Sequence, residues 1–103
     1  MPDVFQILAD PTRRRIVDAL RDGERSVNEL VQVVDIGQPG VSRQLQILED
    51  AGLVRTHKTG RVRRCELEPE RIDAAAQWIE QLRRRWDRRL DRIEKYARQQ
   101  EKR

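Results

Sequence analysis

The sequence predicts a mostly helical chain with one small β-hairpin, a winged helix-turn-helix in the order α-α-α-α-β-β-α. Three observations predict this fold class. Two short helical patterns meet at a tight turn over residues 26–51. A basic hairpin pattern follows directly over 53–67. A long amphipathic pattern then runs from residue 69 to about residue 100, with apolar residues three and four apart as on one side of a helix.

Two helices are predicted before residue 23. The first is a short apolar segment over residues 4–8. Asp10 can cap the second, because a side-chain oxygen there accepts hydrogen bonds from free backbone N–H groups, and Pro11 suits its first turn. Gly23 is expected to end this helix in a left-handed conformation. The inward-facing residues of the second helix are Ile16, Val17, Ala19 and Leu20.

The next two helices form the helix-turn-helix. Ser26 and Glu29 have the spacing of a capping box, in which each side chain accepts a hydrogen bond from the other residue's backbone N–H. A helix is predicted over 27–34, a turn over 35–37, and a second helix from Gln38 to the Ala51-Gly52 pair. The inward residues of the second helix are Val41, Leu45 and Leu48.

A hairpin and a long helix complete the chain. Strands are predicted over 53–58 and 62–67, with Thr59-Gly60 at the tip, because glycine takes the positive φ that such turns need. Pro69 then ends the sheet and begins the long helix. Its apolar stripe consists of Ile72, Ala75 or Ala76, Ile79, Leu82, Trp86, Leu90, Ile93 and Ala97.

Length and charge limit the function. The 103 residues suit one domain over 1–103, in which 10–68 form the core and 1–9 and 69–103 are dimerisation helices. The formal net charge is +4, which favours a polyanionic partner. Residues 70–103 carry 11 Lys/Arg against 7 Asp/Glu, so the whole excess lies there. A solvated helix rich in arginine also explains this tail.

The outward face of the helix that starts at Gln38 favours contact with double-stranded DNA. It is polar, and residues 38–48 include Arg43 but no acid. Arginine can pair with guanine and glutamine with adenine in the major groove. Free N–H groups at a helix start can hold a phosphate. The predicted DNA-contacting residues of this recognition helix are Gln38, Pro39, Gly40, Ser42, Arg43 and Gln44.

The hairpin is predicted to contact phosphates or the minor groove. Arginines on a strand can also simply protect an exposed sheet edge. The cations here gather at the tip, however, whereas Arg55 and Arg64 lie further back and can either support the helix or pair with acids. The predicted wing residues are Lys58, Thr59, Arg61 and Arg63.

The first and last helices are predicted to form a two-fold dimer interface, because the apolar stripe is long for the small core that one chain offers. The alternative is that all these residues pack within one monomer. A dimer would set two recognition helices roughly 34–36 Å apart and so predicts a palindromic or near-palindromic site. The predicted interface residues are Val4, Phe5, Leu8, Ile79, Leu82, Trp86, Leu90 and Ile93.

Four segments carry a resemblance to a known family: ADPTRRRIVDAL, SVNELVQ, QPGVSRQLQILEDAGLV and GRVRRCEL. The chain resembles the ArsR-type winged-helix repressors over about residues 4–68. The resemblance implies a dimeric bacterial transcription repressor, with residues 38–44 on the DNA-reading helix and 58–63 in the wing. Gln44 stands where many members carry His. Metal-sensing members often have paired cysteines on the helix that matches 27–34, but this stretch is VNELVQVV.

The residue types exclude several other functions. One Cys and one His, Cys65 and His57, cannot build a thiolate or imidazole cluster, so no metal site and no cofactor is predicted. A site made of carboxylates alone stays open as an alternative, but it would be weak for soft metals. Cys65 is interpreted as a small, half-buried strand residue rather than a thiol switch. No nucleophile-and-base pair or phosphate-binding glycine loop indicates an enzyme. No apolar run is long enough to cross a membrane, so a cytoplasmic location is expected.

Two alternatives to a DNA-binding repressor stay open. Exposed arginines at 83–85 and 88–89 also suit a protein-interaction module that docks a partner through the long helix. RNA binding is less favoured, because single-strand binding usually uses stacking aromatic side chains and the hairpin has none. No residue pattern identifies an inducer.

Overall fold

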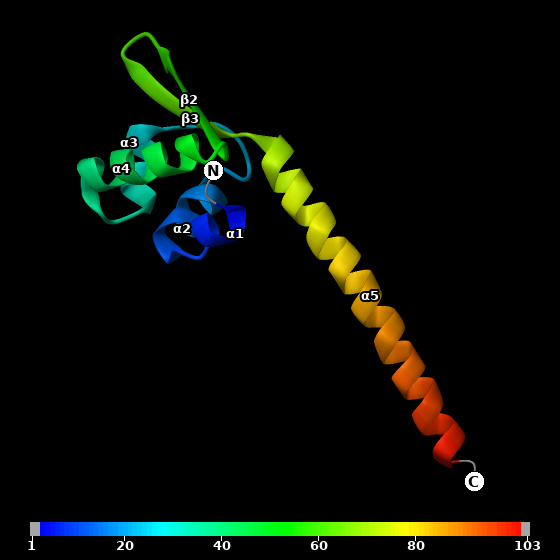
Figure 1. Cartoon of the computed structure of the whole chain (residues 1–103). Coiled ribbons are helices and arrows are strands. Elements are labelled where there is room, and N and C mark those ends of the chain that lie inside the picture. Colours follow the sequence, from blue (N-terminus) through cyan, green and yellow to red (C-terminus); the bar gives the residue numbers. More distant parts are fainter. Residues whose placement is uncertain (1–2, 102–103) are drawn as a thin grey trace. The chain divides into compact units, whose positions relative to one another are not determined.

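The computed structural model describes residues 3–101 and shows the predicted order of elements with one addition. The additional element is a two-residue strand before the third helix. In Figure 1 the first four helices gather at the base of the hairpin. The elements are α1 (Val4–Leu8), α2 (Pro11–Ala19), β1 (Arg25–Ser26), α3 (Val27–Val33), α4 (Gly37–Asp50), β2 (Val54–Thr59), β3 (Val62–Leu67) and α5 (Pro69–Glu101).

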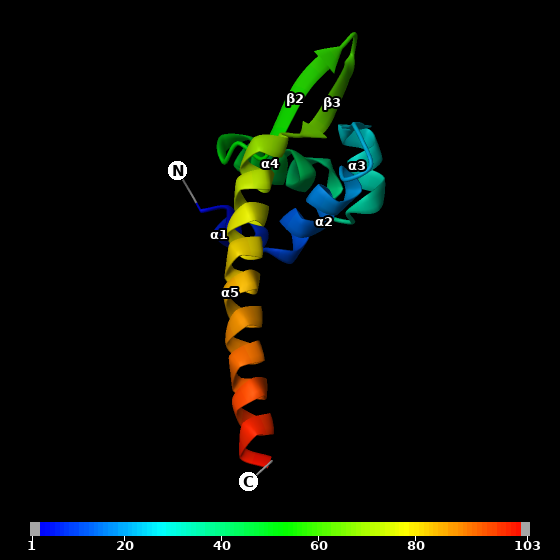
Figure 2. The same ribbon diagram turned by 90° about the vertical axis from the view of Figure 1, so that its right-hand side faces the viewer.

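The three strands form one antiparallel sheet in the order β1-β3-β2. The central strand β3 pairs with the wing strand β2 along its whole length, from Val54↔Leu67 to Thr59↔Val62. On its other edge, Ser26 pairs with Arg64. Figure 2 shows the β2–β3 hairpin beside α3. The start of α3 is therefore joined directly to the base of the hairpin.

Side-chain caps begin the helices where the sequence predicts them. The Asp10 carboxylate accepts a hydrogen bond from the Arg13 N–H at 3.0 Å and so begins α2. Ser26 and Glu29 form the predicted capping box of α3, with N–O distances of 3.1 and 3.2 Å. A second capping box, not predicted from the sequence, begins α1 at Asp3. Each cap satisfies backbone N–H groups that the helix itself leaves unpaired.

Three predicted boundaries were wrong by one to a few residues. The helix α2 ends at Ala19, and Gly23 (φ 145°) closes the turn that follows it. The helix α4 begins at Gly37, one residue early. The hairpin tip is Gly60-Arg61 rather than Thr59-Gly60, because Thr59 pairs with Val62. Only glycines have positive φ among residues 3–101, and Gly60 (φ 65°) takes the first central position, as in a type II′ turn.

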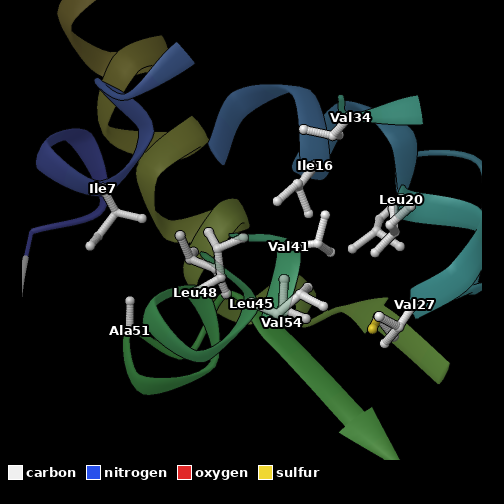
Figure 3. Packing of buried hydrophobic residues seen from close by; sticks show 13 residues of the cluster. Ile7, Ile16, Leu20, Val27, Val34, Val41, Leu45, Leu48, Ala51 and Val54 are labelled. Atoms are coloured by element: carbon white, nitrogen blue, oxygen red, sulfur yellow. The ribbon is translucent and has the colours of Figure 1, made fainter. Parts of the chain in front are cut away.

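One core joins α1–α4 to the base of the sheet, and Figure 3 shows its side chains meeting between these elements. The predicted inward residues of α4 are all buried. Cys65, predicted to be half-buried, is fully buried on the inner face of β3. Replacing a buried Leu of such a core by Ala typically costs about 2–5 kcal/mol. The fully buried side chains include Ile16, Leu30, Val34, Val41, Leu45, Leu48 and Leu53.

The chain divides into two compact units, Met1–Ile72 and Asp73–Arg103. The start of α5 belongs to the first unit: Ile72 packs against the core, and Arg71 Nη1 donates a hydrogen bond to the Ala51 carbonyl at 2.7 Å. The second unit is the rest of α5. The predicted terminal helices also include residues 1–2 and 102–103, which lie outside the described residues.

The apolar stripe of α5 is exposed along the second unit. No residue of α5 is buried. The exposed fractions are 50% for Ile79, 40% for Leu82, 53% for Trp86, 56% for Leu90 and 63% for Ile93. Among residues 3–101, no helix has the length and apolarity needed to cross a membrane.

Candidate nucleic-acid interface

The outward face of α4 presents polar and basic side chains without an acid until Glu49. Gln38, Pro39 and Arg43 are exposed, and Ser42 is half-buried. No side chain caps the N-terminus of α4, since its N-cap residue is Ile36. The first N–H groups of α4 are therefore without a side-chain acceptor, as an anion at this end would require.

A groove of about 230 Å³ lies beside this face and joins three separate segments of the chain. One wall is the start of α3, the second is α4, and the third is the tip of the wing. Asn28 lines the groove but was not predicted from the sequence, although its polar type beside the apolar positions of α3 is a usable signal. The lining residues are Ser26, Val27, Asn28, Gln38, Ser42, Arg61, Val62 and Arg63.

The wing carries its unpaired cations at the end away from the core. Lys58 pairs with Arg63 across the hairpin, so the two side chains lie on the same face of the sheet. Arg61 lies in the tip. Within residues 3–101, neither Lys58 nor Arg61 has an ion pair. Arg63 is held more closely, because its Nη2 lies 3.3 Å from Thr56 Oγ1 and 3.9 Å from a Glu49 carboxylate oxygen.

The base of the wing is neutralised by ion pairs. Arg55 contacts Glu66 and lies 3.1 Å from Glu68, and the hydrogen bond to Glu66 raises the pKa of Arg55. Arg64 forms an ion pair with Glu24. The prediction that these two arginines lie further back and pair with acids is therefore confirmed. Among the described residues of α4 and the wing, the cations without an ion pair are Arg43, Lys58 and Arg61.

Two residues of the predicted recognition helix have partners inside the protein. Gln44 is half-buried, and its Oε1 accepts a hydrogen bond from Arg13 Nη1 of α2 at 3.2 Å. The same arginine donates to the Ile7 carbonyl of α1 at 2.8 Å. A Cβ on Gly40 would lie 3.1 Å from the Ile36 side chain, so this glycine fits a close contact within the fold.

Glu24, His57 and Glu66 meet on the outer face of the hairpin, with ligand atoms all within 4.8 Å of one another. Each carboxylate already has an arginine partner, Arg64 for Glu24 and Arg55 for Glu66. Those guanidinium groups compete directly with a cation for the same oxygens. The local charges therefore oppose a metal ion at this cluster.

The Cys65 thiol is buried beneath the sheet. Burial raises its pKa, because the apolar surroundings disfavour the thiolate. Since the thiolate is the form that reacts with oxidants and metals, this environment favours an inert thiol.

Comparison with known proteins decides the family. The model of the bacterial regulatory protein arsR family matches residues 10–56, which include α2–α4 and the first residues of β2. The HTH-type transcriptional regulator Rv2034 of Mycobacterium tuberculosis is 39% identical over 74 residues, which are 71% of this chain and 69% of that protein. The chain belongs to the ArsR family. This confirms the resemblance found in the sequence.

Other members of the ArsR family agree with this assignment. The transcriptional repressor SdpR of Bacillus subtilis is 29% identical over 79 residues, 77% of this chain and 88% of that protein. The solved structure of an ArsR-like transcriptional regulator from a Rhodococcus species has a TM-score of 0.73 at 30% identity, covering 91% of this chain and 86% of that one. Some other relatives are longer, because the matched part of this chain covers 44% of the length of one and 61% of the length of another.

Membership of the ArsR family establishes a transcriptional regulator with a DNA-binding helix-turn-helix. The similar proteins are regulators rather than enzymes. The winged-helix architecture is likewise shared with the solved structure. The family match ends at Thr56, before the wing tip, so the roles of Lys58, Arg61 and Arg63 rest on their own geometry and charge.

Proposed function

We propose that this ArsR-family protein is a homodimeric repressor that binds a palindromic or near-palindromic site in double-stranded DNA, in the cytoplasm. The groove between α3, α4 and the wing carries the proposal. It places a polar helix face beside a cationic hairpin tip, while the carboxylates at the base of the hairpin are ion-paired. Base edges in a major groove and the neighbouring phosphates fit these two surfaces.

The recognition helix α4 enters the major groove in this proposal. Arg43 is exposed and can donate two hydrogen bonds to guanine, and Gln38 can pair with adenine. Ser42 lines the groove beside them. Pro39 and Gly40 lie in the first turn of α4, which begins at Gly37. Backbone N–H groups of this turn other than that of Pro39, which has none, can hold a phosphate. Gln44 contributes through its hydrogen bond with Arg13, which supports the position of α4.

The wing contacts the sugar-phosphate backbone. Lys58 and Arg61 carry charges that no carboxylate within residues 3–101 neutralises, and Thr59 precedes the tip with an exposed hydroxyl. Arg63 shares its charge with the Glu49 carboxylate at 3.9 Å, so we expect it to contribute less than Arg61. Such contacts strengthen binding to every sequence and weaken as salt rises.

The dimer interface is proposed on α5 and α1. Ile79, Leu82, Trp86, Leu90 and Ile93 are 40–63% exposed in one chain, and a continuous exposed apolar surface of this kind marks an association site. Residues 69–103 and 1–9 would then be the dimerisation helices around a DNA-binding core of 10–68. A two-fold pair places the same helix in two successive major grooves. In α1, Phe5 is exposed, whereas Val4 and Leu8 also pack against the core.

Two substitutions with one control test the DNA-binding surfaces. Selection of binding sites from random duplexes, followed by titration of the selected site, is measured for Arg43→Ala, Arg61→Gln and Arg55→Gln. We expect Arg43→Ala to relax base preference at one position of each half-site, a loss of about 1–3 kcal/mol of discrimination per contact. Arg61→Gln should weaken all duplexes alike. Arg55→Gln removes the same charge from the ion-paired base of the wing and should change little.

Wild-type affinity and base preference in both the Arg43 and Arg61 variants would refute the assignment. A stable hetero-complex in a pull-down, with no DNA shift at low salt, would favour the protein-interaction module instead.

A further inference from the structure

The second half of α5 carries a row of cations on the side away from its apolar stripe. Arg85, Arg88, Arg92 and Lys95 are three or four residues apart, so they lie along one side of the helix. We call these four residues the basic stripe. Gln81 and Gln99 extend the same row at its two ends, and the row contains no acid. All four cations are exposed.

The basic stripe differs from Arg83, Arg84 and Arg98 of the same helix in forming no ion pair within residues 3–101. Arg83 and Arg84 lie 3.2 and 3.5 Å from Glu80, and Arg98 lies 2.5 Å from Glu94. Within residues 3–101, no carboxylate forms an ion pair with the four residues of the stripe. Like charges at this spacing repel one another, and a bound anion would relieve that repulsion.

The stripe also borders a concave surface. A hollow of about 520 Å³ is lined by three of its residues, Arg85, Arg88 and Arg92, and on its apolar side by Leu82 and Trp86 of the proposed dimer interface. Arg89, whose guanidinium lies 5.7 Å from the centre of the Trp86 ring, completes the cationic part of the lining. Arginine presents several N–H donors in a planar fork that matches phosphate oxygens. This surface can therefore hold phosphate groups through more than one arginine.

We propose that the basic stripe is a second, sequence-independent contact with the phosphate backbone of double-stranded DNA, outside the base pairs that α4 reads. The inference rests on the proposed DNA-binding function and extends it to a surface of the second unit. The stripe runs over residues 85–95, with four cations along about 15 Å of helix, and duplex DNA presents one charge per about 1.7 Å of its axis. The phosphate charges are thus more closely spaced than the four cations, so each cation has a phosphate to face along the duplex.

An anionic membrane fits this helix less well than DNA does. A helix at a membrane surface inserts its apolar side and needs cations along the border of that side. One border of the apolar stripe is instead acidic, with Asp73, Glu80, Asp87 and Glu94 recurring every seven residues. The proposed dimer would also cover the apolar stripe, including Leu82 and Trp86, so the arginine side of the hollow would stay accessible.

Two triple variants test the proposal with equal changes in charge. The test variant is Arg85→Gln, Arg88→Gln and Arg92→Gln. The matched control is Arg83→Gln, Arg84→Gln and Arg98→Gln, which removes three ion-paired arginines from the same helix. Binding to a duplex of about 40 base pairs without the selected site is measured by fluorescence anisotropy over a series of KCl concentrations. Circular dichroism and sedimentation check that helicity and dimerisation are kept.

The expected result is a shallower salt dependence for the test variant only. Each phosphate contact contributes about 0.9 to the slope of log K against log salt, so losing three contacts per chain lowers the slope by about 2.7, or about 5 if both copies engage the duplex. The control variant should keep the wild-type slope. Equal slopes for wild type and test variant would overturn the inference.

Two further measurements separate this inference from its rivals and from the proposed function. If the test variant loses binding to phosphatidylserine vesicles or polyglutamate while its DNA slope is unchanged, the stripe belongs to a membrane or an acidic protein and the inference is wrong. Site preference reports on the proposed function separately. If the Arg43→Ala variant keeps the wild-type site preference, the assignment of α4 as the recognition helix is refuted. This holds for any salt slope of the stripe variant.

Discussion

Replacing Trp86 by Ala should disrupt the proposed dimer, and the structure gives the size of the effect. Trp86 is 53% exposed in one chain. Since an aromatic residue of this size can bury about 150–250 Å², about 80–130 Å² of Trp86 is left for a second copy to cover. At about 25 cal/mol per Å² this is about 2–3 kcal/mol per chain, or about 4–6 kcal/mol for the two-fold pair. The dissociation constant should rise by about three to four powers of ten.

Sedimentation equilibrium over nanomolar to micromolar concentrations measures this change. Tyr96→Ala is the matched control, because Tyr96 is a 64% exposed aromatic residue of the same helix but lies outside the predicted apolar stripe. We expect the control to keep most of the dimer. Urea denaturation monitored by circular dichroism confirms that both variants retain the fold.

A Trp86→Ala protein that dimerises as tightly as wild type would refute the interface. Equal loss in the Trp86 and Tyr96 variants would refute the proposed stripe, because it would show that the helices meet through a different side. The DNA affinity should fall together with the dimer, since a single chain can occupy only one half of a palindrome.

Three further predictions concern the first unit. Gln44→Leu removes the acceptor for Arg13 and should cost about 1.5 kcal/mol of unfolding free energy in urea titrations; an unchanged value would show that the bond contributes nothing. The backbone hydrogen bond with Ser26 lowers the pKa of Glu29. The ionised Glu29 carboxylate therefore stabilises the folded state fully at neutral pH, and this contribution is lost as the pH falls below about 4.5. Glu29→Gln should flatten the acid side of the stability profile, and an unaltered profile would contradict this. Cys65 should react with Ellman's reagent only as fast as the protein opens, because the thiol is buried and burial raises its pKa. Rapid labelling of the native protein would contradict the buried position of this thiol.

Local signals made most of the fold predictable. The Asp10 cap and the Ser26–Glu29 box act within one turn of helix, and the structure shows both. The strand β1 could not be found in this way. It consists of two residues that pair with Arg64 and Cys65, about forty positions away, and two residues carry no alternating pattern.

The candidate site was predictable in its chemistry but not in its detailed membership. A polar face and a basic hairpin are properties of composition, so Arg43 and Arg61 could be singled out from the sequence. The orientation of the Gln44 side chain depends on its hydrogen bond with Arg13, which is 31 residues earlier in the chain. A contact between such distant residues cannot be predicted from the local sequence pattern. Asn28 lines the groove because β1 draws the start of α3 towards the wing.

The short strand β1 has a consequence for the kind of duplex that fits. Ser26 pairs with β3, and its hydroxyl also begins α3, so one residue couples the angle of the hairpin to the axis of that helix. The distance between the wing and the helix-turn-helix is thus already fixed in the free protein. A fixed spacing between wing and recognition helix favours binding to B-form over A-form duplexes, because the A-form major groove is too deep and narrow for side chains to read.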